Sequence, residues 1–380
     1  MLTAVETLQQ QGILSALDLH LAKFMHRLDA AHDSILLSVA LTSYAVAHGH
    51  ICLNLAAYAK QPFPVVTQDD EIVPIICPEL DRWLSQLHAS SIVGSAGEFK
   101  PLILQNNYLY FYRYWQYEQQ LAYYIRLHLH KAEAVNFANL ENGLQRLFAG
   151  SDALQQLAAR RAVEQNFCII SGGPGTGKTS TVVKILALLL EQNPNLRIAV
   201  AAPTGKAAAR LQEVITQYKQ SLNCDNAIKQ AIPQQSYTIH RLLGTKPHSI
   251  QFKSNVNNLL PYDVIVVDEA SMIDLALMTK LAAAISPSAR WILLGDKDQL
   301  ASVEAGTVLG DICTPSDNGS KLQQYTVLLE KSYRFQNNSG IGQLAVKQGD
   351  NDAAMRSSVK NTQILFGMNS IRLKLSNKIY

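Results

Sequence analysis

Cysteine is scarce in this 380-residue sequence, and its five cysteines are spread widely without a C-x-x-C pair. The five are Cys52, Cys77, Cys168, Cys224 and Cys313. This spacing gives no reason to expect a cysteine metal site or a disulfide framework. Buried thiols in a reducing compartment are the better interpretation.

Long apolar runs are also missing. The longest, SILLSVALTSYAVA, has about fourteen residues and is interrupted by Ser and Thr, so it is too short to cross a bilayer and reads as a core helix. The N-terminal segment MLTAVETLQQQG has no basic stretch followed by an apolar core, so we expect no signal peptide. Both absences lead us to expect a cytoplasmic protein with no membrane partner.

Carboxylates are absent from residues 353–380, which hold five basic side chains. The chain carries a net charge of +3, but its first 352 residues have 28 basic and 30 acidic groups, a net charge of −2. The positive total therefore gives no support for a basic nucleic-acid surface. With 48% apolar residues, the length suits two to three compact domains.

Residues 1–130 form a region that we expect to be a mainly helical N-terminal domain. Residues 13–28 have apolar side chains at helical spacing, and the next helical run begins with Asp33 and would end at Gly49. In NNYLYFYRYWQYEQQLAYYIRLHLH the first half alternates like a strand, and helical spacing starts at about Gln116. These aromatic residues suit either base stacking or, as we prefer, a core with a polar edge.

Residues 131–352 alternate short aliphatic runs with helical patterns. The runs are FCIIS, RIAVAAP, DVIVVDE and RWILLG, each followed by a loop and a helix. This alternation predicts an α/β domain whose parallel sheet is covered by helices on both faces.

The segment SGGPGTGKTS, residues 171–180, fits the P-loop pattern G-x-x-x-x-G-K-[ST] between a strand and a helix. Backbone N–H groups of such a loop surround phosphate oxygens at a helix N-terminus. Lys178 would reach the β- and γ-phosphates of ATP, and Thr179 would offer its hydroxyl to Mg²⁺. The candidate ATP-binding residues here are Gly172, Gly173, Pro174, Gly175, Thr176, Gly177, Lys178, Thr179 and Ser180.

The segment YDVIVVDEAS places Asp268 and Glu269 at the end of an apolar strand. Asp268 would hold Mg²⁺, directly or through water, and Glu269 would orient and deprotonate the attacking water. Two adjacent carboxylates in this position are costly unless a cation or a water network meets them. The sequence therefore predicts a P-loop NTPase that uses ATP as substrate and Mg²⁺ as cofactor.

Three further segments extend the pattern. In AAPTGKAAARL, Thr204 and Lys206 lie between the end of a strand and the start of a helix. The N-terminus of that helix would be a second anion-binding site. In WILLGDKDQLASVEAG, Gln299 could reach a γ-phosphate, and LLEKSYRF supplies Arg334 as a candidate arginine finger. Two anion sites on one sheet suit ATP and a nucleic-acid phosphate.

Taken in order, GGPGTGKT, APTGKAAARL, TIHRLLG, VVDEASMID, GDKDQLASVEAG and SYRF resemble the motifs of superfamily 1 helicases. They most closely resemble RecD, the alpha subunit family of bacterial exonuclease V (the RecBCD complex). GHICLNL and LYFYRYWQYEQQLA also look like the N-terminal region of that family. The resemblance covers about residues 10–352.

The resemblance implies roles for individual residues. Gln155 would read adenine, with neighbouring Gln156 as a rival, and Gln299 would sense the γ-phosphate. Lys178, Glu269, Gln299 and Arg334 would be catalytic, and Thr179 and Asp268 would hold Mg²⁺. Single-stranded DNA would run past Thr204, Lys206 and His240, although a buried core histidine is an equal alternative for His240.

The resemblance also implies an ATP-driven 5′-to-3′ DNA helicase subunit that acts in double-strand-break repair with RecB-like and RecC-like partners. Residues 1–130 would bind the partner and residues 131–352 would form the first RecA-like motor domain. Residues 353–380 do not resemble the family's continuation, so we expect a truncation or frameshift near residue 352, with a short basic tail as the alternative. Without a second motor domain, an ATP-binding docking protein or motor remnant is the alternative to a helicase. A stand-alone helicase is a third interpretation.

Overall fold

The computed structural model describes residues 1–29, 33–64, 73–132, 135–299, 305–306, 308–313 and 321–331. Its contacts divide these residues into two compact units: an N-terminal unit of residues 1–117 with residues 305–306, and a second unit of residues 118–299, 308–313 and 321–331. Each unit has its own hydrophobic core. Within the described ranges, no helix is both long and apolar enough to cross a membrane.

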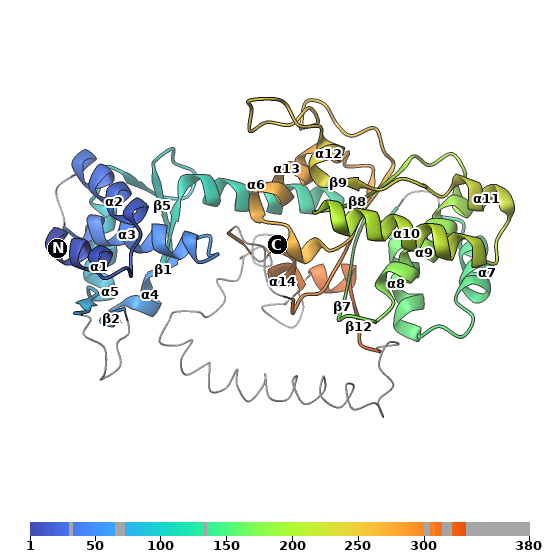
Figure 1. Cartoon of the computed structure of the whole chain (residues 1–380), viewed down its shortest axis with the longest axis horizontal. Coiled ribbons are helices and arrows are strands. Elements are labelled where there is room, and N and C mark those ends of the chain that lie inside the picture. Colours follow the sequence, from blue (N-terminus) through green and yellow to red (C-terminus); the bar gives the residue numbers. More distant parts are fainter. Residues whose placement is uncertain are drawn as a thin grey trace. The chain divides into compact units, whose positions relative to one another are not determined.

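The N-terminal unit combines helices with a small mixed sheet, which Figure 1 shows in blue and cyan. Its sheet has the order β1-β6-β5-β4, in which β4 and β5 are parallel and the other neighbours are antiparallel. The elements are α1 (Leu2–Gln10), α2 (Ala16–Leu28), α3 (Asp33–Ala47), β1 (Leu53–Asn54), α4 (Leu55–Tyr58), β2 (Pro62–Phe63), β3 (Ile75–Ile76), α5 (Leu80–His88), β4 (Val93–Gly94), β5 (Leu102–Gln105) and β6 (Tyr108–Phe111).

Helix α3 is the long apolar run, and eleven of its fifteen residues are buried. Two of its hydroxyls are hydrogen-bonded inside the core: Ser38 donates to the Ser34 carbonyl and accepts a 2.7 Å hydrogen bond from the Trp83 indole, and Thr42 donates to the Ser38 carbonyl. Satisfied polar groups of this kind can be buried at little cost. The interpretation of this run as a core helix is therefore confirmed.

Helix α6 (Tyr112–His128) begins four residues earlier than the spacing predicted. Strand β6 pairs with β5 up to Phe111 and Leu102, and the residue before Leu102 is Pro101. Proline has no N–H to continue the ladder. The Tyr112 N–H instead donates to the Pro101 carbonyl, and the chain turns into the helix.

The aromatic segment behaves as a core with a polar edge. Tyr110 is buried, whereas most of its aromatic neighbours are half-buried, and Trp115 donates a 3.0 Å hydrogen bond to Gln105. Cys52, Cys77, Cys168 and Cys313 are buried free thiols, as expected, and Cys224 is half-buried. Burial raises the pKa of the Cys168 thiol to about 12.

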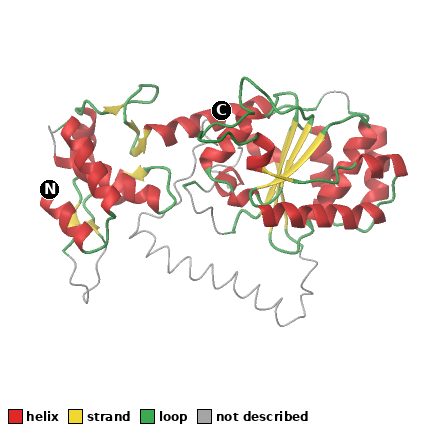
Figure 2. Cartoon of the chain, turned by 45° about the horizontal axis from the view of Figure 1, so that its top comes forward, coloured by secondary structure: helices red, strands yellow, loops and turns green. Residues whose placement is uncertain are grey.

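The second unit contains the predicted parallel sheet with helices on both faces (Figure 2). The strand order is β12-β7-β11-β10-β8-β9, and every neighbouring pair is parallel. Its elements after α6 are α7 (Phe137–Leu147), α8 (Ala153–Glu164), β7 (Phe167–Gly172), α9 (Lys178–Gln192), β8 (Ile198–Ala202), α10 (Gly205–Ser221), α11 (Asn226–Ala231), β9 (Tyr237–Thr238), α12 (Ile239–Leu243), β10 (Val264–Val267), η1 (Ala270–Met272), α13 (Leu275–Ala284), β11 (Arg290–Gly295), α14 (Val308–Cys313), η2 (Lys321–Tyr325) and β12 (Thr326–Leu329).

Successive side chains along each strand point to opposite faces of the sheet, and each face is covered by an apolar layer. One face, which includes Ile170, Val266 and Leu294, shares a core with α7, α8 and α9. On the other face the rings of Phe167 and Trp291 lie 5.2 Å apart. Strands that are buried on both faces consist of continuous apolar runs, so these strands could be predicted from the sequence. Strand β9 has only two residues and was not expected.

Candidate nucleotide-binding site

The P-loop, residues 171–180, connects β7 to α9. Gly175 and Gly177 have φ angles of 82° and 81°, in the left-handed region that glycine adopts without strain. A Cβ on Gly172 would lie 2.8 Å from the Leu329 carbonyl oxygen of β12. These glycines let the loop turn tightly into the N-terminus of α9, where backbone N–H groups favour an anion.

Lys178 and Thr179 open α9 and point toward different groups. The Lys178 ammonium donates to the carbonyls of Gly172 and Gly173, so it lies against the inner side of the loop. The Thr179 hydroxyl donates to Oδ2 of Asp268 at 3.3 Å. Residues 89 positions apart in the sequence thus meet where β7 and β10 end.

Asp268 is buried, with 7% of its surface exposed. Burial raises the pKa of its carboxyl, against the opposing effects of the Glu269 N–H, the Lys178 ammonium and the Thr179 hydroxyl. A buried carboxylate beside a hydroxyl offers the hard oxygen donors that Mg²⁺ prefers. The residues present therefore fit a Mg²⁺ ion held by Asp268 and Thr179.

Glu269 has a left-handed backbone, with φ 53° and ψ 39°. This conformation is uncommon for a residue other than glycine and often marks a functional site. The Glu269 N–H donates a 2.9 Å hydrogen bond to Oδ1 of Asp268. The two carboxylates are thereby held on one turn at the end of β10.

Gln299 reaches the same cavity from the loop after β11. The Ser271 hydroxyl donates to Gln299 Oε1 at 2.9 Å, which fixes the amide beside the Asp268–Glu269 turn. A Cβ on Gly295 would lie 3.0 Å from the Ser271 nitrogen, so glycine allows β11 to end close to this turn. Asp296, which the sequence reading missed, also lines the cavity.

Gln155 lies on α8 and is buried, and its side-chain amide donates to the Thr176 carbonyl at 3.1 Å. It therefore contacts the P-loop directly. The rival Gln156 is exposed and donates to the Phe148 carbonyl, and it does not line the cavity.

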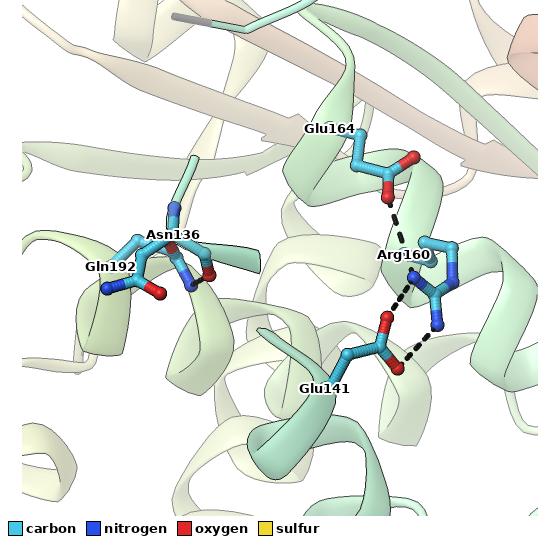
Figure 3. Close-up of polar contacts among 5 residues, drawn as sticks. All are labelled: Asn136, Glu141, Arg160, Glu164 and Gln192. Carbon is cyan, nitrogen blue, oxygen red and sulfur yellow. Dashed lines mark hydrogen bonds and ion pairs between the residues drawn. The ribbon is translucent and has the colours of Figure 1, made fainter. Parts of the chain in front are cut away.

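Polar contacts fasten α7 to the two helices that carry Gln155 and the P-loop (Figure 3). Arg160 of α8 forms a two-pronged ion pair with Glu141 of α7 and lies 3.6 Å from Glu164. At the N-cap of α7, the Asn136 N–H donates to Gln192 of α9, and the Gln192 amide donates back to the Asn136 carbonyl. Such contacts fix α8 and α9 relative to each other.

These groups surround a cavity of about 690 Å³, within the range of small-molecule sites. Its lining residues are Gly150, Ser151, Gln155, Pro174, Gly175, Thr176, Gly177, Lys178, Thr179, Ser180, Lys184, Ala207, Arg210, Leu211, Val214, Tyr218, Asp268, Glu269, Asp296 and Gln299. The structure thus brings most of the expected ATP-site residues together.

The expected DNA-contact residues do not line this cavity. The Thr204 hydroxyl caps α10 by accepting from the Ala207 N–H, and Lys206 is exposed. His240 is exposed with its ring 5.6 Å from Phe252, so the alternative of a buried core histidine is wrong. Arg334 lies outside the described residues.

Two family models match the chain. The "RecBCD enzyme subunit RecD, N-terminal domain" matches residues 10–110, and "AAA domain" matches residues 155–305. RecBCD enzyme subunit RecD of Mycolicibacterium smegmatis is 38% identical over 357 residues, which cover 90% of this chain and 59% of that protein. Its counterpart in Haemophilus influenzae is 33% identical over 408 residues, which cover 93% of this chain and 64% of that protein.

The chain is similar to RecD subunits over about nine-tenths of its own length.

The chain spans about three-fifths of the length of these RecD relatives. Among solved structures, the UvsW helicase from bacteriophage T4 is 11% identical with a TM-score of 0.34, covering 53% of this chain and 70% of that one. A likeness that distant carries no functional argument.

Some residues that line the cavity were not found from the sequence. Asp296 could have been noticed, because it directly follows a strand, as Asp268 does. Lys184 lies four residues after Ser180 and therefore on the same face of α9. Tyr218 carried no signal, because α10 comes near α9 only through the tertiary fold.

Proposed function

We propose that this chain binds Mg·ATP in the cavity and hydrolyses it as the ATPase part of a DNA helicase subunit. The observation that carries the proposal is the meeting of Lys178, Thr179, Asp268, Glu269 and Gln299 around one cavity. These groups come from the ends of three parallel strands and the loops that follow them. Ligands bind at this edge of open α/β sheets.

Each residue has a distinct role in the proposed hydrolysis. Lys178 leaves the P-loop carbonyls and pairs with the β- and γ-phosphates. Glu269 orients a water against the γ-phosphorus and accepts its proton as the P–O bond to ADP breaks. Gln299, anchored by Ser271, contacts the γ-phosphate and reports its loss. Bound Mg²⁺ neutralises phosphate charge.

The biological assignment follows from the RecD family. We propose a subunit that moves 5′ to 3′ on single-stranded DNA in double-strand-break repair, with RecB-like and RecC-like partners docked on the N-terminal unit. Thr204, Lys206 and His240 would contact the DNA, and Arg334 would complete the ATP site. The match of residues 10–110 to the RecD N-terminal domain supports the docking role.

A second candidate is an ATP-binding docking protein without motor action. The N-terminal unit has a hydrophobic core of its own, and this observation favours the second candidate. A unit with its own core can bind a partner without a motor domain. Strand separation by the purified chain, measured with a fluorescent forked duplex, decides between the two. Measurable unwinding would remove the docking-only candidate, and no unwinding by a chain that hydrolyses ATP would favour it.

ATP hydrolysis by the purified chain, with and without single-stranded DNA, tests the proposed activity. Lys178→Ala should abolish turnover. Lys229→Ala, which removes a half-buried lysine on α11 outside the cavity, is the matched control and should leave turnover unchanged. DNA-stimulated turnover that survives Lys178→Ala would contradict the assignment of this site.

A further inference from the structure

The cavity continues well beyond the residues that would hold the phosphates. Gly150, Ser151 and Lys184 line this extension on one side, and Val214 and Tyr218 of α10 line it on the other. None of these residues belongs to the P-loop or to the carboxylate turn. The extension therefore offers room for a group other than the β- and γ-phosphates.

The length of the extension suits the rest of a nucleotide. Helix α10 lines the cavity from Ala207 to Tyr218, which at 1.5 Å per residue is about 16 Å. Lys184 lies one turn beyond Ser180 on α9. Because both helices start at the edge of the sheet where the strands end, Lys184 and Tyr218 lie on the far side from Glu269 and Gln299.

Lys184 is a partly buried cation held in place by neutral groups. Its ammonium donates a 2.9 Å hydrogen bond to the Ser151 hydroxyl and lies 4.8 Å from the centre of the Phe148 ring. Burial lowers the pKa of Lys184. Among the ion pairs of the described residues, none involves Lys184.

Tyr218 gives the other wall a large ring in a position open to the cavity. It is 41% exposed although it lies on the same side of α10 as the buried Leu211 and Ile215. Leu211 and Val214 precede it along the cavity wall. Beyond Arg210, the α10 wall is apolar and ends in an aromatic ring, and this end suits a flat heterocycle better than a further phosphate.

We propose that Tyr218 and Lys184 form the base end of the nucleotide pocket. Tyr218 stacks on the purine ring, and Lys184, steadied by Ser151 and Phe148, donates a hydrogen bond to an acceptor of the base or ribose. These two side chains make the pocket prefer a nucleoside triphosphate to a bare polyphosphate. The inference rests on the proposed ATP binding and adds residues that decide its specificity.

Titration calorimetry on the full chain with Mg·ATP and with Mg·tripolyphosphate tests the inference. The wild type should bind ATP more tightly than tripolyphosphate. Tyr218→Ala should weaken ATP binding about tenfold, within the range for loss of one stacked base, and change tripolyphosphate binding less than twofold. Tyr218→Phe should retain ATP affinity, which shows that the α10 wall tolerates substitution.

Lys184→Met should also weaken ATP binding more than tripolyphosphate binding. Gln217→Ala, on an exposed position next to Tyr218 and outside the cavity, is the matched control. Unchanged ATP binding in Tyr218→Ala, or an equal loss for both ligands, would overturn the inference while leaving ATP binding intact. A wild type that binds neither ligand would overturn the proposed function itself.

Discussion

At the scale of single residues, Glu269 combines a strained backbone with a place beside a buried carboxyl. Its left-handed φ of 53° is maintained by the neighbouring hydrogen bonds to Asp268 and by the close end of β11. Strain of this kind persists only where the surroundings enforce it. We infer that the turn is fixed before any ligand arrives.

Replacing Glu269 by Gln should separate ATP binding from ATP hydrolysis. The amide keeps the size of the side chain but cannot accept the proton of water, so turnover should fall by roughly 10²- to 10⁴-fold. The affinity for ATP should change little. Steady-state turnover and calorimetry measure the two effects, and Asp298→Asn, outside the cavity, is the control. Full activity of Glu269→Gln would exclude it as the base.

His128 should make the stability of the second unit depend on pH. Burial lowers its pKa, helped by the charge of His130 and opposed by hydrogen bonds to the carbonyls of Tyr124 and Ser286. Below the ordinary pKa of 6.5, the unfolded chain then binds more protons than the folded one. The stabilisation is complete above pH 6.5 and is lost as the pH falls toward the lowered value.

The slope from this one group is at most about 1.4 kcal/mol per pH unit. Urea unfolding between pH 5 and pH 8 should show a flatter profile for His128→Gln than for the wild type. The exposed His240, changed to Ala, is the control and should keep the wild-type slope. Identical slopes for the wild type and His128→Gln would refute the assignment.

At the scale of elements, α7 is positioned by a close approach to α9. A Cβ on Gly143 would lie 2.4 Å from Cδ2 of Leu188, whose side chain is buried in the core. Glycine costs helix stability in this position, so its presence is explained by the space that it leaves. The ion pair of Arg160 with Glu141 joins the same helix to α8.

Gly143→Ala should therefore destabilise the second unit by about 1 kcal/mol, as overpacking exceeds the gain in helix propensity. Asn142→Ala, on the exposed side of the same helix, gains propensity without a clash and should be neutral or slightly stabilising. Urea unfolding measures both variants. A more stable Gly143→Ala would mean that Leu188 moves aside freely.

At the scale of the whole molecule, the two units have separate cores, and the nucleotide cavity is lined only by residues of the second. A ligand stabilises only the folded unit that binds it, by about 2.7 kcal/mol at a hundredfold excess over its Kd. Scanning calorimetry should show two transitions, of which Mg·ATP raises only one. Two transitions that rise equally would contradict independent units.

The sequence by itself determined the α/β class and most of the local site. The apolar strands, the glycines of the P-loop and the Asp268–Glu269 pair were readable because they depend on near neighbours in the chain. It also showed α3 as a core helix. The early start of α6 was missed because the lack of a donor at Pro101 matters only once β5 and β6 pair.

Only the tertiary structure decided which distant residues share the cavity. The order β7-β11-β10 brings Gln299 and Asp296 next to the P-loop, and α10 brings Tyr218 near α9. Strand order depends on how whole helices and sheet faces pack, and many orders fit the same local pattern. The phosphate end of the pocket could therefore be read from motifs, whereas its proposed base end required the fold.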